Sequence, residues 1–174
     1  MEQIKAQRRM LICAAFYSLG CLSGAVTLFK LSDSAVARIT DLLCSCCLRS
    51  PFFLIPLVSA LGPMLAVIIG PSAFGAVVVC GIITLSGFVG GFLEYLAIRI
   101  GFFPILSAAY LMLYSYCLLQ IGGILLRISF LRCRRVFSSG FSKPDRLFDH
   151  GRIIAAFLVL LLASFAFSLF VLSL

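Results

Sequence analysis

The sequence predicts an all-α integral membrane protein, a polytopic bundle in which about five helices cross the bilayer. Of its 174 residues, 63% are hydrophobic and only 11% are charged, whereas soluble domains carry about 25% charged residues. The apolar residues form long unbroken blocks, and a helix needs about 20 of them to cross roughly 30 Å of hydrocarbon. These blocks lack the alternation of barrel strands, so helices are the expected way to pair the backbone in lipid. We therefore expect one membrane domain over residues 1–174.

The first predicted span covers residues 10–29 and follows a basic segment that contains Lys5, Arg8 and Arg9. Within this span, a short stretch ending at Cys21 has a faint likeness to a lipoprotein cleavage site. The apolar run continues beyond this cysteine, which favours an uncleaved span over a signal peptide.

Residues 33–49 show a different pattern. Polar side chains recur there every three or four positions, and apolar side chains follow the same period on another face. This pattern is typical of a short amphipathic helix that lies at the membrane surface. Ser32 is placed to cap that helix.

A charge-free run of 43 residues, 51–93, comes next. It is too long for one crossing and fits two. Gly70-Pro71 is the strongest turn signal within it. Alternatively, the proline only kinks a longer helix and the turn lies near Gly81, which leaves the topology unchanged. A turn at Gly70-Pro71 gives spans over 52–69 and 72–93.

Two further spans are predicted over residues 102–126 and 153–174, separated by a basic loop over 127–152. Glu94 and Arg99 mark a membrane interface before them, because a charged side chain at the centre of a span costs about 2.5–3.5 kcal/mol. The final run contains no charged residue and is the clearest of the five spans.

The cations are distributed unevenly between the two predicted sides. Ten lie with the amino terminus and the basic loop, and four lie opposite, so the positive-inside rule predicts a cytoplasmic amino terminus. The net charge of +8 is confined to short segments between apolar blocks, which is typical of topology signals and contacts with anionic lipid. We therefore expect no nucleic-acid partner. The ten cations are Lys5, Arg8, Arg9, Arg127, Arg132, Arg134, Arg135, Lys143, Arg146 and Arg152.

Ionisable residues are scarce within the predicted spans. Glu94 is the only acid between Asp41 and Asp145, whereas proton relays and ion-coupled transporters place such groups inside the bundle. The chain has no H-E-x-x-H motif, and its sole histidine, His150, falls in the basic loop as a solvated residue. We therefore predict no enzymatic activity and no catalytic residue.

Eight cysteines raise the question of metal or redox chemistry. Four of them lie in predicted spans and are expected to behave as small apolar residues. The cluster Cys44, Cys46 and Cys47 lies on the surface helix, and its reactivity stays open. Zinc sites need about four ligands, and Cys133 and His150 are predicted on the other side of the membrane, so we expect no metal and no cofactor.

Glycines four residues apart occur in two predicted spans. Gly20 and Gly24 form one pair, and Gly87 and Gly91 form another. Such pairs share a helix face and allow a neighbouring backbone to approach closely. Packing within the bundle is the more common use of this face, and contact with the span of another protein is the alternative.

A polar stripe is predicted on the fourth span, where Ser107, Tyr110 and Tyr114 follow helical spacing, continued by Cys117. Such a stripe could face a ligand cavity. More commonly, side chains of this kind form hydrogen bonds between helices.

The order of these features resembles that of the stage II sporulation protein M family of five-span bacterial membrane proteins. The basic start, the glycine-bearing first span and the surface helix agree in layout. The residue-level likeness covers about Gly70 to Pro104, through Ile69-Gly70-Pro71, Cys80-Gly81-Ile82, Gly87-Phe88-Val89-Gly90-Gly91-Phe92-Leu93 and Ile100-Gly101-Phe102-Phe103-Pro104. The chain departs from the family at Cys80, where a lysine is usual, and it lacks the family's Pro-Gln-Asn stretch in the fourth span.

The resemblance implies a bacterial cell-membrane protein that acts as a non-enzymatic scaffold in sporulation. Such proteins help the mother-cell membrane engulf the forespore and position partner peptidoglycan-degrading enzymes. The close-packing glycine faces and the missing catalytic groups are compatible with this role, and on that basis we expect Gly87, Gly90 and Gly91 to be helix-packing positions. The alternative function is the substrate-binding membrane subunit of a vitamin-type importer, with Tyr110 and Tyr114 on the wall of its pocket. A lipid-modifying enzyme is disfavoured, because acid–base residues are missing.

Overall fold

A computed structural model describes residues 2–49, 51–72, 74–100, 104–137 and 148–172, and these residues form helices joined by short turns. The all-α prediction is confirmed for this part of the chain. The helices are α1 (Glu2–Phe29), α2 (Asp33–Arg49), α3 (Pro51–Ile69), α4 (Gly75–Ile100), α5 (Pro104–Phe137) and α6 (Phe148–Leu172).

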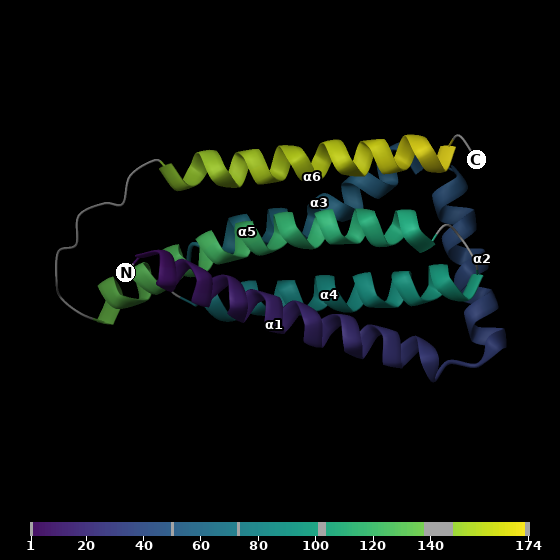
Figure 1. Ribbon diagram of the computed structural model, residues 1–174, viewed down its shortest axis with the longest axis horizontal. Coiled ribbons are helices and arrows are strands. Elements are labelled where there is room, and N and C mark those ends of the chain that lie inside the picture. Colours follow the sequence, from purple (N-terminus) through teal and green to yellow (C-terminus); the bar gives the residue numbers. More distant parts are fainter. Residues whose placement is uncertain (1, 50, 73, 101–103, 138–147, 173–174) are drawn as a thin grey trace.

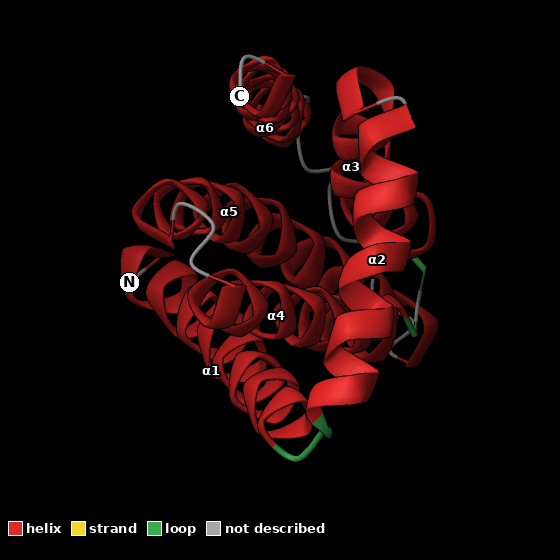
Figure 2. Ribbon diagram, turned by 90° about the vertical axis from the view of Figure 1, so that its right-hand side faces the viewer, coloured by secondary structure: helices red, strands yellow, loops and turns green. Residues whose placement is uncertain are grey.

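Five of these helices run side by side along the length of the molecule, and α2 lies across one end of the bundle (Figures 1 and 2). Helix α5 occupies the centre, where it contacts α1, α3, α4 and α6. The most extensive contact between helices joins α1 to α4, which are far apart in sequence. The two ends of the chain lie at opposite ends of the bundle (Figure 1).

Within the described part of the chain, four helices are long and apolar enough to cross a membrane, over Lys5–Phe29, Gly75–Arg99, Ile105–Cys133 and Gly151–Leu169. The described side chains of α3 give a shorter apolar stretch, Pro56–Ile69. Large apolar side chains cover the outside of the bundle, such as Ile105 at 86% exposure and Val77 at 76%. Soluble proteins rarely expose such surfaces, so the structure indicates a multi-pass membrane protein.

The turn in the long charge-free run lies at Gly70-Pro71, and Gly81 is inside α4. Helix α3 ends at Ile69, and the following Gly70 N–H donates to the Ala66 carbonyl at 2.7 Å. Gly75 then starts α4. A Cβ added at Gly75 would overlap the carbonyl oxygen of Gly70. Glycine at position 75 therefore permits this tight turn.

The structure differs from the expected boundaries at both ends of the basic loop. Residues 127–137 continue α5, and residues 148–152 already belong to α6, so the connection is shorter than the predicted 127–152. Arginine is a good helix former, and residues 127–137 contain no glycine or proline, so the helix continues beyond residue 126. Helix α1 likewise begins at Glu2, before the predicted start at residue 10.

The main apolar core lies where α5 meets α1, α3 and α4. Ile83 of α4 and Ile121 of α5 are fully buried there, beside Cys13 of α1 and Ala66 of α3. A second small cluster joins α1, α2 and α4 at the end of the bundle that α2 covers. It consists of Leu28, Val36 and Leu96.

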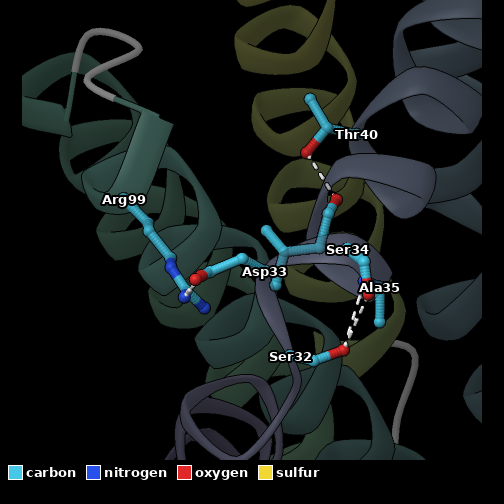
Figure 3. A network of polar contacts seen from close by, with 7 residues as sticks. Ser32, Asp33, Ser34, Ala35, Thr40 and Arg99 are labelled. Carbon is cyan, nitrogen blue, oxygen red and sulfur yellow. Dashed lines mark hydrogen bonds and ion pairs between the residues drawn. The ribbon is translucent and has the colours of Figure 1, made fainter.

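Helix α2 is attached to the bundle end by polar contacts as well. Ser32 caps its first turn, since its carbonyl accepts from the Ala35 N–H at 3.0 Å and its Oγ lies 3.4 Å from the same nitrogen. Asp33 forms an ion pair with Arg99 near the end of α4 (Figure 3). Asp33 is almost fully exposed, so this pair contributes only about 0–1 kcal/mol. The apolar contact of Val36 therefore holds α2 in place more than the ion pair does.

Candidate functional site

The two glycine pairs face each other at the contact between α1 and α4. A Cβ added to Gly20 or Gly24 would overlap the carbonyl oxygens of Thr84 and Phe88 on α4. A Cβ added to Gly87 or Gly91 would overlap the carbonyl oxygens of Tyr17 and Cys21 on α1. The glycines therefore let the two backbones touch, which strengthens van der Waals contact along this seam.

Gly90 packs against side chains rather than backbone. It is buried, and a Cβ there would lie 3.1 Å from the Tyr17 hydroxyl and 3.6 Å from Leu111 of α5. It therefore lies between α1 and α5, beside the seam of the glycine pairs. All five predicted packing glycines are thus in contact with helices of the same chain, and none of these contacts needs a second protein.

The polar stripe on α5 forms hydrogen bonds to three neighbouring helices. The Tyr110 hydroxyl lies 2.5 Å from Ser59 Oγ on α3 and 3.0 Å from Ser164 Oγ on α6. Its ring stacks on Phe167 of α6, with centroids 4.6 Å apart. Tyr110 therefore joins α3, α5 and α6 in the interior of the bundle.

Near the α2 end of the bundle, Ser107 donates from Oγ to Glu94 Oε2 on α4 at 2.9 Å. Glu94 is half-buried and lies about 9 Å along α4 from its last residue, at 1.5 Å per residue. Tyr114 is half-buried one turn from Tyr110, and their ring centroids are 6.4 Å apart. The stripe thus connects α5 to α3, α4 and α6 by hydrogen bonds, which agrees with the second interpretation of this pattern, hydrogen bonding between helices.

The structure adds an interhelical contact that the sequence did not reveal. Ser129 on α5 is fully buried, and its Oγ accepts from the Ala76 N–H at 2.8 Å. The same hydroxyl donates to the Ser72 carbonyl at 3.1 Å. Ala76 lies in the first turn of α4, where backbone N–H groups lack partners within the helix. Ser129 therefore caps α4 from another helix.

A sequence signal for Ser129 exists, although it is indirect. Ser129 continues the helical face that carries the buried residues Leu118, Ile121 and Leu125. A serine on an otherwise apolar buried face needs a hydrogen-bond partner in lipid. The pattern gives the need for a partner but not its identity.

The described cysteines carry free thiols, and no group of three or more metal-ligating side chains occurs among the described residues. Cys13 and Cys117 are buried among apolar residues. The side chains of Cys44, Cys46, Cys47 and His150 lie outside the described part of the structure.

Electrostatic charge divides the bundle into two unlike ends. Described cations gather at the end formed by the starts of α1 and α6 and the end of α5, which we call the basic end (Figure 1). The opposite end, covered by α2, carries Asp33, Asp41 and Glu94 together with a smaller number of cations. The described cations of the basic end are Lys5, Arg8, Arg9, Arg127, Arg132 and Arg152.

Taken with the four long apolar helices, these contacts define a multi-pass helical membrane protein whose interior polar groups connect its own helices. No protein-family model, curated protein or solved structure matches the chain.

A conservative change at Tyr110 measures what the interior hydroxyls contribute. Tyr110→Phe removes both hydrogen bonds of the hydroxyl and keeps the ring stacked on Phe167. Hydrogen bonds between helices in membranes average about 0.6 kcal/mol and reach about 1.7 kcal/mol. We expect a loss of about 1–2 kcal/mol in the free energy of unfolding, measured by denaturant titration in mixed micelles.

Tyr116→Phe is the matched control for this change. Tyr116 lies on the same helix and its side chain is 58% exposed. The same substitution there should therefore keep the free energy of unfolding within about 0.5 kcal/mol of the wild-type value. Equal effects at the two tyrosines would contradict a structural role for the Tyr110 hydroxyl.

Proposed function

We propose that this chain is a non-catalytic membrane scaffold, a self-contained bundle that presents its outer surfaces to partner proteins. One observation carries the proposal: the polar stripe of α5 forms hydrogen bonds to neighbouring helices through Tyr110 and Ser107. An importer subunit of the alternative kind would need these groups to face its ligand. Polar groups that hold helices together favour a fixed framework over a binding cavity.

The proposed topology has five spans and a cytoplasmic amino terminus. Helix α3, Pro51–Ile69, is the fifth span; it is 19 residues long and packs along α6. An odd number of crossings agrees with chain ends at opposite ends of the bundle (Figure 1). The concentration of cations at the basic end favours the cytoplasm for that side.

Reporter fusions test this topology directly. Alkaline phosphatase is active outside the cytoplasm and green fluorescent protein is fluorescent within it, so a pair of fusions at each chain end reports its side. We expect fluorescence from green fluorescent protein fused at the amino terminus and activity from alkaline phosphatase fused after Leu174. Both ends in one compartment would overturn the five-span arrangement.

The proposed role lies in bacterial endospore formation, where the scaffold positions peptidoglycan-degrading partners during engulfment. The resemblance of residues 70–104 to the stage II sporulation protein M family supports this role. It includes Gly87 and Gly91 of the α1–α4 backbone contact and Gly90 beside it. The stretch 101–103 of that resemblance lies outside the described residues.

A clean deletion in a spore-forming host tests the role. We expect engulfment to stall while vegetative growth stays normal, with recovery when the wild-type gene is supplied in trans. Crosslinked cells should yield wall hydrolases with the tagged protein. Normal engulfment in the deletion strain would reject the role, and loss of small-molecule uptake in that strain would favour the importer instead.

A further inference from the structure

An open groove runs along the outer surface of the bundle where α1 and α4 meet the end of α5. Its floor includes Gly81, which is exposed and has no atom within 4 Å of the place where a Cβ would stand. Apolar side chains from three helices form the walls. The residues that define this groove are Ile12, Phe16, Ala76, Gly81, Phe88 and Phe130.

The two hydroxyl groups that line the groove have no hydrogen left to donate to a ligand. Thr84 Oγ1 donates to the Cys80 carbonyl at 2.9 Å, and Ser23 Oγ donates to the Gly20 carbonyl at 2.8 Å. Both hydroxyls are therefore satisfied within their own helices. The groove presents a hydrocarbon-like surface, which suits a hydrocarbon chain rather than a polar molecule.

The length of the groove matches one leaflet of the membrane. From Ala76 to Phe88 it extends about 18 Å along α4, at 1.5 Å per residue. Half of the hydrocarbon core is about 15 Å thick. A transmembrane helix from a partner would need a surface of about 30 Å, so the groove fits an acyl chain of one leaflet better than a helix.

Positive charge continues the groove at its end nearest the basic end. Arg8 and Lys5 precede Ile12 by four and seven residues on α1, so they lie on the helix face that Ile12 and Phe16 present to the groove. Both are exposed. An acyl chain in the groove would thus place its headgroup near two cations.

We propose that this groove binds one acyl chain of an anionic phospholipid from the leaflet at the basic end. Lys5 and Arg8 hold the phosphate, and Gly81 leaves the space that the chain occupies. This site is independent of the scaffold role, because its ligand is a lipid and Gly81, where the chain lies, belongs neither to the glycine pairs nor to the α5 stripe.

Native mass spectrometry of the full chain tests the site, with dioleoyl phosphatidylglycerol and dioleoyl phosphatidylcholine titrated into detergent micelles. We expect the wild type to retain one phosphatidylglycerol in preference to phosphatidylcholine. Gly81→Leu should abolish that preferred binding, since the new side chain fills the floor of the groove. Gly151→Leu is the matched control, because Gly151 is also exposed with no atom within 4 Å of a Cβ.

The double variant Lys5→Gln/Arg8→Gln tests the headgroup contact and does not alter the groove. We expect phosphatidylglycerol affinity to fall about five-fold for each cation removed, with phosphatidylcholine binding unchanged. Equal binding of the two lipids by the wild type would overturn the proposal. It would also be overturned if Gly81→Leu and Lys5→Gln/Arg8→Gln both bound phosphatidylglycerol as tightly as the wild type does. A Gly81→Leu protein that changes from dimer to monomer without losing lipid would show that a second copy occupies the groove.

Discussion

Gly24→Leu should separate α1 from α4 and destabilise the bundle by about 3 kcal/mol, the upper part of the range for overpacked sites. A Cβ at Gly24 already overlaps the carbonyl oxygen of Phe88, and the neighbouring atoms are backbone. A backbone cannot rotate away as a side chain can, so the helices must move apart. The change is measurable as a lower midpoint in denaturant titrations of the purified protein in mixed micelles.

Gly151→Leu controls for the added bulk of leucine. Its surroundings are open, so its unfolding midpoint should match that of the wild type. A disulfide assay adds a structural readout: cysteines introduced on facing positions of α1 and α4 should crosslink in the wild-type background and fail to do so with Gly24→Leu. Unchanged crosslinking and stability would show that α1 and α4 are not in backbone contact there.

Ser129→Ala should cost about 1–3 kcal/mol, the usual penalty for leaving buried polar groups without partners. The substitution leaves the Ala76 N–H and the Ser72 carbonyl without the hydroxyl that now joins them. Water cannot easily replace it, since Ser129 is fully buried. Slower amide hydrogen exchange at the start of α4 in the wild type than in the variant would report the lost cap directly.

Ser115→Ala on the same helix provides the comparison. Its Oγ bonds only locally, to the Met112 carbonyl at 2.8 Å, so alanine there should shift the unfolding free energy by less than about 0.5 kcal/mol. If both serines gave the same small change, the start of α4 would not depend on a cap from α5.

Local patterns were sufficient to predict the helices, because periodicity and turn residues act over a few positions. The three-to-four spacing of residues 33–49 gave α2, and Gly70-Pro71 gave the turn before α4. The boundary of α5 is harder to predict: the arginines past residue 126 indicate a loop by their charge, although arginine is a good helix former and the helix runs on to Phe137.

Contacts between distant helices could not be predicted in the same way. A glycine pair indicates a helix face without bulky side chains. Both pairs have such a face, and neither pattern indicates which helix packs against it. The Asp33–Arg99 pair joins residues 66 positions apart, and sequence spacing carries no information on such a contact. The polar stripe of α5 could be recognised as a face, whereas its partners Ser59 and Ser164 lie on helices whose rotation only the assembled bundle fixes.

The pairing of α1 with α4 has a consequence for biosynthesis. Roughly 60 residues separate the two glycine faces, so at about 5–20 residues per second α1 enters the bilayer several seconds before its partner is made. During this interval its small-residue face is covered only by lipid or by the insertion machinery. Helix α1 is therefore open to pairing with another nascent helix until α4 arrives, and the contact between the two glycine faces forms only after that.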